Sequence, residues 1–478
     1  MMHMGALFIK LLIPIQAFFI SVLPVSSFTE GGTSQPKSFL PHQAQDRHER
    51  TVASLIYRGL FKYDIYGSIT PDLAETWKTS ADGISYTVTI RKNQKWSDGS
   101  TITADDIIYT SFNLPQLRDV ATDKIDARTV RFTLPNRYAP FLNLLTAPIM
   151  KNETIKNDSP LMPVSSGTYK IVSVRKQGPE VKEISLINTT QSPNFKKLVF
   201  KYYANNEELL IGAKLGEVDG FIHPDDLDIP SFRNYKFPLQ SVYYAIYFNL
   251  QNETLSNKDL RQKMEKVLPK DRLVSIYGIP VQGPISRSVF TDESLSFDSY
   301  DELYTDDLSG THKLILTAPD LPTHRTLARQ IQELWEDKLD LDIELKFIDP
   351  DKITDTVVKP RRYELLLYGQ EISRDPDRYV NWHSTQKNYP GLNLSGFEQV
   401  RADRALEEGR NTLQNEKRVV HYKQFQKVVH EETPAIFLYH PYVNYYITDY
   451  ISNVGEKYTF TYADRFLDIN AWVRKITN

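Results

Sequence analysis

The chain has 478 residues, which is too many for a single hydrophobic core, so we expect two or three domains. Hydrophobic residues make up 41% and charged residues 24% of the sequence, a globular composition that argues against large-scale disorder. The formal net charge of -3, without a long basic run, argues against a nucleic-acid binder, and the absence of cysteine excludes disulfides, thiolate metal sites, cysteine nucleophiles and a lipid-modified N-terminal cysteine.

The N-terminal segment predicts export. Residues 11–25 are apolar and uncharged, and their length fits the hydrophobic region of a signal peptide better than a full membrane span. Small residues allow cleavage after Ser27, so residues 1–27 are interpreted as a signal peptide or, if they are retained, as an N-terminal anchor. Residues 28–40 contain Gly, Ser, Thr and Pro and are predicted to be a linker, with folded sequence starting near Pro41.

The first predicted elements are a strand, a turn and a helix. Residues 85–90 alternate strictly between apolar and hydroxyl-bearing side chains, which predicts a half-buried strand. The Asp-Gly pair at 98–99 has the chemistry of a turn. Thr103 stands three residues before Asp106 in a weak relative of the capping box, and this spacing predicts a helix that runs towards Phe112.

Residues 313–369 have the rhythm of a parallel sheet. The pattern predicts a strand at 313–317, a helix from Pro322, an alternating strand at 341–347, a helix start at Asp349-Pro350 and a strand at 363–368. Such an order implies right-handed crossovers. A second α/β region is predicted between about 160 and 245, where a helix closes at Gly216. Two α/β lobes in one chain predict a cleft between them.

Catalytic motifs are missing from the sequence, which has neither a P-loop nor a G-x-S-x-G elbow. His430 and Glu431 begin a segment like a zinc-protease helix, but Pro434 stands where the second histidine belongs. His421 and His430 do not share a helical face at ligand spacing, and no carboxylate pair stands out. We therefore assign no catalytic residue, no metal ligand and no cofactor, and we expect that the protein is not an enzyme.

Several separated segments carry short motifs in a fixed order. These segments are 55–61 (LIYRGLF), 71–77 (PDLAETW), 86–91 (YTVTIR), 95–99 (KWSDG), 103–107 (TADDI), 163–169 (PVSSGTY), 215–219 (LGEVD), 247–249 (YFN), 375–377 (DPD) and 432–438 (ETPAIFL). Each motif alone is weak. Together they cover nearly all of the chain after residue 40, and they resemble the extracellular solute-binding proteins of family 5, the oligopeptide- and dipeptide-binding type that serves peptide and nickel ABC transporters.

The resemblance implies an α/β fold of the large, three-domain periplasmic-binding-protein type. Two lobes would be joined by a hinge, and they would enclose a ligand when the interlobe cleft closes. The implied boundaries are 41–60, 160–245 and 437–478 for a discontinuous lobe I, 61–159 for a domain inserted in lobe I, and 246–436 for lobe II.

The candidate ligand-binding residues begin with Tyr368, Gly369, Gln370 and Glu371, which directly follow a predicted parallel strand. Ligands of open α/β sheets bind beyond the carboxyl ends of strands. The resemblance implies that this strand end pairs with a peptide backbone, which a glycine allows to approach closely. It also implies a nearby carboxylate that holds the ammonium group of the peptide.

The chain departs from the family pattern at this carboxylate. The family acid commonly lies four residues before the proline of D-P-D, and here Ile372 stands at that distance from Pro376. Either the loop holds an extra residue and Glu371 takes the role, or the amine contact is absent. Asp375 is a second candidate, although D-P-D is also typical of a turn.

Further candidates surround this segment. Trp382 is either a ligand contact or a core residue. Gln43 and Gln45 precede the first family helix and are expected to form a rim of the same cleft. A peptide carboxylate would need a cationic anchor, for which Arg374 is a candidate by its proximity in sequence.

The predicted function is that of an exported substrate-binding component of an ABC importer. It would capture a peptide and deliver it to the permease subunits, acting as a monomer at the periplasmic or extracellular face of the cytoplasmic membrane. Membrane association would come through the transporter or an N-terminal anchor. The alternatives are a binder of another nutrient such as a nickel chelate or a sugar, a ligand sensor, and a cell-envelope hydrolase.

Overall fold

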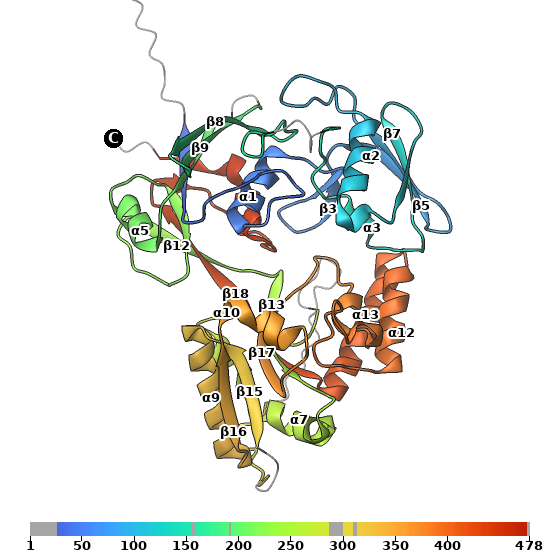
Figure 1. Ribbon diagram of the computed structural model, residues 1–478, viewed down its shortest axis with the longest axis vertical. Coiled ribbons are helices and arrows are strands. Elements are labelled where there is room, and N and C mark those ends of the chain that lie inside the picture. Colours follow the sequence, from blue (N-terminus) through green and yellow to red (C-terminus); the bar gives the residue numbers. More distant parts are fainter. Residues whose placement is uncertain (1–25, 154–158, 191–192, 286–299, 309–312, 476–478) are drawn as a thin grey trace, which may run out of the picture.

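The computed structural model describes residues 26–153, 159–190, 193–285, 300–308 and 313–475, which form two lobes along the long axis of the molecule (Figure 1). The predicted signal segment at 11–25 lies outside these residues. In the described part of the chain, one mixed sheet of twelve strands runs through both lobes. Its order is β16 (Ile343–Ile348), β15 (Leu314–Pro319), β17 (Leu365–Glu371), β13 (Val242–Phe248), β18 (Ala435–Thr448), β11 (Gly220–His223), β1 (Ser27–Gly32), β10 (Lys197–Tyr202), β9 (Glu180–Asn188) and β8 (Tyr169–Gln177), with β12 (Phe232–Pro238) and β14 (Gly278–Pro280) paired to β18.

The lower lobe of Figure 1 contains the predicted parallel unit. Strand β15 pairs in parallel with β16 and β17, and α9 (Pro322–Leu339) connects β15 to β16. Helix α9 buries Leu327, Ile331 and Trp335 on one face, as its periodicity predicts. The strand-helix-strand prediction is confirmed here. The lobe also contains α6 (Glu253–Ser256), α7 (Lys258–Lys266), α8 (Lys270–Val274), α10 (Pro350–Ile353), the π-helix η2 (Thr354–Val358), α11 (Tyr379–Trp382), η3 (Ser384–Gln386), α12 (Val400–Asn411) and α13 (Asn415–Glu432).

Strand β18 joins the lobes. Its residues 435–439 pair with β13 in the lower lobe, and residues 442–448 pair with β12 in the upper lobe. The chain enters the lower lobe just before Val242, beside this strand, where the N–H of Leu239 donates to the carbonyl of Pro441 at 2.8 Å. The chain therefore passes between the lobes at two places, and these two chain crossings lie side by side.

The upper lobe corrects one expectation. Residues 28–40 are not a linker, because β1 lies between β10 and β11 and pairs with both in parallel. Phe28 and Phe39 are 1% and 0% exposed. The glycines at 31 and 32 belong to this strand. The composition of residues 28–40 is typical of a linker, although its two aromatic residues lie in the core. Helix α1 (Arg47–Ile56) follows, with Asp46 as its N-cap, and α5 (Asn206–Lys214) lies at the edge of the lobe.

The inserted domain confirms the strand, turn and helix predicted near residues 85–112. Strand β5 (Ser85–Ile90) is central in a four-stranded sheet in this described region, and α2 (Ala104–Asn113) begins after Thr103. The N–H of Thr103 donates to Asp106 Oδ2 at 2.8 Å, as part of the expected capping box between these two residues. The remaining elements are β2 (Phe61–Tyr63), β3 (Ile69–Pro71), β4 (Ala74–Thr79), η1 (Pro115–Leu117), β6 (Ala121–Lys124), β7 (Thr129–Thr133) and α3 (Phe141–Leu144), and near the C-terminus β19 (Ile451–Ser452), η4 (Tyr462–Phe466), η5 (Ile469–Ala471) and β20 (Val473–Arg474).

None of the helices in the described ranges combines the length and the apolar character needed to span a bilayer.

Candidate ligand-binding cleft

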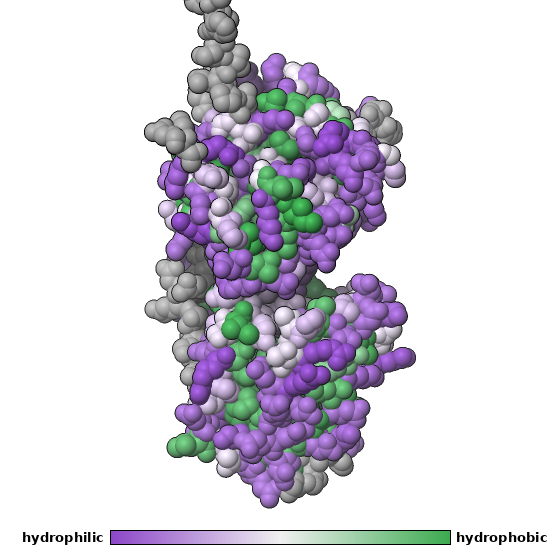
Figure 2. All heavy atoms as spheres, turned by 90° about the vertical axis from the view of Figure 1, so that its left-hand side faces the viewer, coloured by the Kyte–Doolittle hydropathy of each residue, from purple (hydrophilic) through white to green (hydrophobic). Residues whose placement is uncertain are grey.

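The two lobes touch away from the chain crossings, between the inserted domain and the segment after β17. Asn143 Nδ2 donates to Asp375 Oδ2 at 3.2 Å, and the N–H of Ala139 donates to the carbonyl of Arg410 at 2.8 Å. The Arg410 guanidinium also lies 5.3 Å from the centre of the Tyr138 ring. Figure 2 shows a notch in the surface at mid-height, between the two lobes. The lobes therefore meet at discrete contacts beside an open notch.

A hollow of about 410 Å³ lies between the lobes at these contacts. Its walls include Tyr138 and Phe141 from the inserted domain and Tyr379 and Arg410 from the lower lobe. Two arginines, Arg137 and Arg410, and the carboxylates of Asp119 and Glu407 also line it. Apolar walls with a few polar groups are typical of ligand sites.

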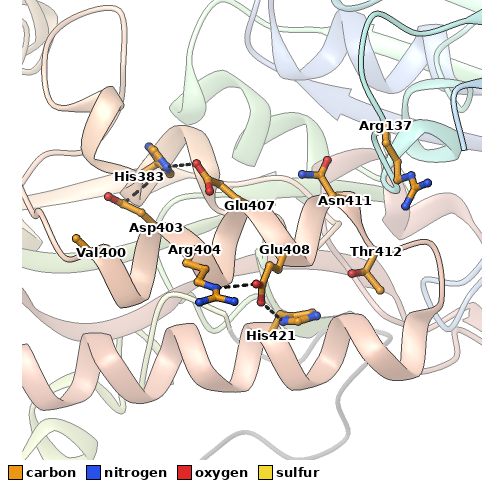
Figure 3. Close-up of a pocket in the computed structure, with 10 residues that line it drawn as sticks. All are labelled: Arg137, His383, Val400, Asp403, Arg404, Glu407, Glu408, Asn411, Thr412 and His421. Carbon is orange, nitrogen blue, oxygen red and sulfur yellow. Dashed lines mark hydrogen bonds and ion pairs between the residues drawn. The ribbon is translucent and has the colours of Figure 1, made fainter. Parts of the chain in front are cut away.

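A larger and more polar hollow of about 790 Å³ lies beside α12 and α13 (Figure 3). His383 Nε2 lies 3.3 Å from Glu407 Oε1, and His421 Nδ1 lies 3.0 Å from Glu408 Oε2. Arg137 reaches the same hollow from the inserted domain (Figure 3). No group of three or more His, Asp or Glu side chains in the described ranges is arranged to hold a metal ion. The acidic and histidine side chains that line this hollow are therefore paired with one another, and they are not arranged as metal ligands.

The predicted tetrapeptide 368–371 lies within β17, which continues through Glu371 and does not end at Tyr368 as predicted. Along one edge it pairs with β13 over its whole length. Along the other edge β15 pairs with Leu365 and Leu366 only, so within the described residues the edge beyond them has no neighbouring strand.

The backbone hydrogen bonds show which residues face that open edge. The N–H of Ile372 donates to Ser241 O at 2.8 Å, and the N–H of Asn249 donates to Glu364 O at 2.8 Å. The backbone N–H and C=O groups of the even-numbered residues of β17 thus point towards β13. The alternation of a strand then directs the backbone groups of Gly369 and Glu371 towards the open edge.

Gly369 has a structural role that the sequence did not show. A Cβ at this position would lie 2.9 Å from two carbons of the Tyr244 ring. That ring is stacked on Tyr439, with centroids 5.0 Å apart, and is tilted against His324. The glycine therefore makes room for an aromatic side chain of its own lobe.

Gln370 and Trp382 belong to the core of the lower lobe. Both are buried, and both bond to Tyr243: its hydroxyl donates to Gln370 Oε1 at 2.7 Å and lies 3.1 Å from Trp382 Nε1. Tyr247 and the carbonyl of Leu392 complete the contacts of the Gln370 amide, at 3.3 and 2.7 Å. The side-chain hydrogen bonds of Gln370 are thus all made within the lower lobe. Trp382 is a core residue, which was one of the two roles that the sequence allowed.

Glu371 and Asp375 differ sharply. Glu371 is exposed at the end of β17. Asp375 is 3% exposed, and its two oxygens accept hydrogen bonds from Arg418 at 2.6 and 3.0 Å. Burial alone would lower the pKa of Arg418, but the hydrogen bonds and charge of Asp375 raise it. Asp375 Oδ1 also accepts from the N–H of Asp377 at 2.9 Å, which is the turn that D-P-D predicted.

Gln43 and Gln45 are exposed just before α1. The N–H of Gln43 bonds to Leu40 O at 2.9 Å, and the N–H of Gln45 bonds to Glu49 Oε2 at 2.8 Å. Their assignment to the cleft rim stays a prediction.

A cluster around Arg374 was missed by the sequence analysis, which named only the arginine itself. Its guanidinium lies over the Tyr63, Phe460 and Tyr458 rings and forms an ion pair with Asp464. Burial raises the pKa of Tyr63 to about 12. The partners stand more than 80 positions away in the chain, so no local spacing connects them.

The two-lobed α/β fold, with a single sheet crossing between lobes and a notch at their contact, defines a solute-binding protein of the periplasmic type. Residues 68–391 match the model of the bacterial extracellular solute-binding proteins, family 5 Middle, and the chain belongs to this family. Family 5 binding proteins are periplasmic or extracellular.

One relative and two solved structures illustrate the likeness. The Probable D,D-dipeptide-binding periplasmic protein DdpA of Escherichia coli (strain K12) is 23% identical, over 88% of this chain and 89% of its own. The oligopeptide-binding protein AppA of Bacillus subtilis, solved with a nonapeptide, has a TM-score of 0.70 and 19% identity, covering 94% of this chain and 99% of its own. NikZ of Campylobacter jejuni, solved with Ni(L-His), has a TM-score of 0.72 and 20% identity, covering 95% and 100%.

Proposed function

We propose that this protein is the exported substrate-binding component of an ABC importer, that it captures peptides between its lobes, and that it performs no catalysis. The observation that carries the proposal is the open edge of β17. Gly369 and Glu371 direct backbone groups towards this edge, and the chain then runs straight to the interlobe contact at Asp375. An extended peptide can add to such an edge by main-chain hydrogen bonds, which depend little on its sequence.

The relatives support the same proposal. DdpA is named as a probable D,D-dipeptide-binding periplasmic protein, and AppA was solved with a nonapeptide. Delivery to the permease subunits then follows from the family, and the apolar residues 11–25 support export, by cleavage or by retention as an anchor. Domain boundaries near those implied by the resemblance, and action as a monomer, are part of the proposal.

Export is tested by cell fractionation with N-terminal sequencing of the mature chain. We expect the protein outside the cytoplasmic membrane, either starting near Phe28 after cleavage or anchored through residues 1–27. A chain found in the cytoplasm with Met1 intact would refute export.

The ligand class is tested by mass spectrometry of material released from the denatured, purified protein. Peptides recovered unchanged would support the proposal and argue against a hydrolase. The structure of NikZ with Ni(L-His) keeps a nickel chelate as the second candidate, so nickel is measured in the same sample.

The edge of β17 is tested by a pair of substitutions at one position. Glu371→Pro removes the N–H directed to the open edge, while proline is tolerated on strand edges. Glu371→Gln keeps the N–H and removes only the charge. If peptides pair with this edge, Glu371→Pro weakens the binding of a peptide and of its N-acetylated form alike. Unchanged peptide affinity in a folded Glu371→Pro variant would contradict edge pairing.

A further inference from the structure

The guanidinium of Arg374 is enclosed by aromatic rings where the lobes meet. Its central carbon lies 4.2 Å from the centre of the Tyr63 ring, 4.9 Å from that of Phe460 and 5.7 Å from that of Tyr458. An ion pair with Asp464 adds a carboxylate, and the two charged side chains are 8% and 10% exposed. We call Tyr63, Tyr458, Phe460 and Asp464 the aromatic cage.

The cage and its cation come from different parts of the molecule. Tyr63 ends β2 in the inserted domain, and the other three members belong to the C-terminal segment that precedes and begins η4. Arg374 comes from the loop after β17 in the lower lobe. The neighbouring Asp375 makes the interlobe hydrogen bond to Asn143. The aromatic cage therefore belongs to the upper lobe, and the arginine that occupies it comes from the lower lobe.

The cage is held in place without the help of Arg374. Asp464 Oδ2 accepts hydrogen bonds from the backbone N–H groups of Phe460 and Thr461, both at 2.8 Å. The Tyr63 hydroxyl donates to Asn143 Oδ1 at 2.7 Å. A fixed carboxylate beside ring faces is the arrangement by which proteins bind guanidinium and ammonium groups of ligands.

There is room for a ligand group beside the cage. Tyr63 and Asp464 both line a hollow of about 410 Å³ that extends towards α1 and the inserted domain. In addition, Nη1 of Arg374 is buried and makes no hydrogen bond within the described part of the chain. Arg374 does not itself line this hollow, and a ligand oxygen that reached the buried Nη1 would be its matching partner.

We propose that the aromatic cage is a cation subsite of the interlobe cleft and that Arg374 is its built-in occupant, so that the protein rejects ligands that place a cationic group there and accepts those that place a carboxylate or carbonyl oxygen there. The inference rests on the proposed binding function and adds to it a residue that determines specificity. A ligand cation can enter only by displacing a buried cation of the protein, and two like charges cannot share the cage.

The test removes the occupant and offers a cation in its place. Calorimetry compares wild type and Arg374→Ala with L-arginine amide and with L-citrulline amide, which has nearly the same shape but no guanidinium charge. We expect Arg374→Ala to bind L-arginine amide at least about tenfold more tightly than wild type does, and more tightly than it binds L-citrulline amide.

Two control variants locate the effect. Adding Asp464→Asn to Arg374→Ala should abolish the gain, because the cage then lacks its carboxylate. Arg325→Ala is the matched control: Arg325 also lies over a ring, 4.4 Å from the centre of Phe347, and pairs with Asp320, but the pair is 39% and 41% exposed. Its removal should give no gain, since water screens that site.

The proposal is wrong if folded Arg374→Ala binds neither amide, binds both equally, or binds L-arginine amide no better than wild type does. If the alanine variant does not fold, Arg374→Gln retains most of the side chain without its charge, and the absence of any gain in that variant is equally contradictory. Because these probes are not peptides, failure of the cage leaves the peptide proposal standing. Recovery of a ligand other than a peptide from wild type would refute only the proposed function.

Discussion

Glu371 is the sequence-predicted carboxylate that remains available to a ligand. Its side chain is exposed at the end of β17, whereas Asp375 is committed to Arg418 by two hydrogen bonds. A buried ion pair of this kind cannot release its acid to a ligand without leaving the arginine charge unpaired. We therefore propose that Glu371, and not Asp375, would recognise a peptide ammonium group at this strand end.

We expect Glu371→Gln to weaken the binding of a peptide with a free N-terminus by about 2 kcal/mol, the low end for a buried charge pair, because this carboxylate is buried only when the ligand covers it. The same change should matter little for the N-acetylated peptide, which brings no charge. Calorimetry on the four combinations of protein and peptide measures this coupling. A coupling energy near zero would remove Glu371 from the site.

At the residue scale, the sequence indicated the strand but neither its end nor the direction in which each side chain points. It grouped Gln370, Glu371 and Asp375 as candidates from their position after the strand and from the family resemblance. In the structure, Gln370 and Asp375 are buried, because Tyr243 bonds to Gln370 and Arg418 bonds to Asp375. Each of these partners stands more than 40 positions away from its residue in the chain. Partners at such separations leave no local pattern in a sequence.

At the scale of elements, β13 and β17 fit together through the ring of Tyr244 over Gly369. The ring has little freedom to move, since it is stacked on Tyr439 and packed against His324. A close-packed interior responds to one added methyl group by strain.

We expect Gly369→Ala to destabilise the protein by roughly 1–3 kcal/mol, the usual cost of overpacking. Chemical denaturation measures the loss. Adding Tyr244→Leu should recover part of the stability, because the smaller side chain vacates the space that the new methyl group needs. Full tolerance of Gly369→Ala alone would show that the ring moves freely.

His324, which lies in α9 against Tyr244, makes the stability of the protein depend on pH. Burial lowers the pKa of this histidine to about 4 from an ordinary value near 6.5, so it is neutral when folded. The unfolded chain takes up a proton as the pH falls below about 6.5, which costs the folded state up to ~2 kcal/mol at pH 5. Stability from this group is complete above pH 6.5 and is lost as the pH falls towards 4.

We expect His324→Phe, which keeps a ring against Tyr244, to flatten the loss of stability between pH 7 and pH 4.5. Denaturation curves at several pH values measure the slope. An equal slope in wild type and His324→Phe would contradict the assignment.

Elements with a strong local pattern were predictable, and the first strand was not. Residues 85–90 and the 313–369 unit show a clear period, whereas β1 contains two glycines and borders the apolar N-terminal run. Its strand character comes from pairing with β10 and β11, which lie more than 160 positions later. Tertiary pairing decides such a segment, and local composition cannot show it.

At the scale of the whole molecule, the lobes are linked by two adjacent chain crossings and held by a few contacts elsewhere. The crossings at 239–241 and 440–442 lie side by side, and the C-terminal segment packs against them, with the N–H of Ser241 donating to Phe460 O at 3.0 Å. Narrow connections between large rigid bodies are typical of hinges. The family pattern indicated two lobes and a hinge, but no sequence signal marked the contacts Asn143–Asp375 and Arg374–Asp464 that draw the lobes together.

These contacts bias the balance between open and closed forms, since each is made only when the lobes meet. We expect the double variant Asn143→Ala with Arg410→Ala to increase the radius of gyration of the free protein in small-angle scattering, because it removes the hydrogen bond to Asp375 and the contact with Tyr138. Ligand should then compact the variant more than it compacts wild type. Arg175→Ala, which breaks an exposed ion pair within the upper lobe, is the control and should change neither value. Equal radii for the free double variant and free wild type would show that other contacts hold the lobes, and ligand binding without compaction of either protein would refute closure about this hinge.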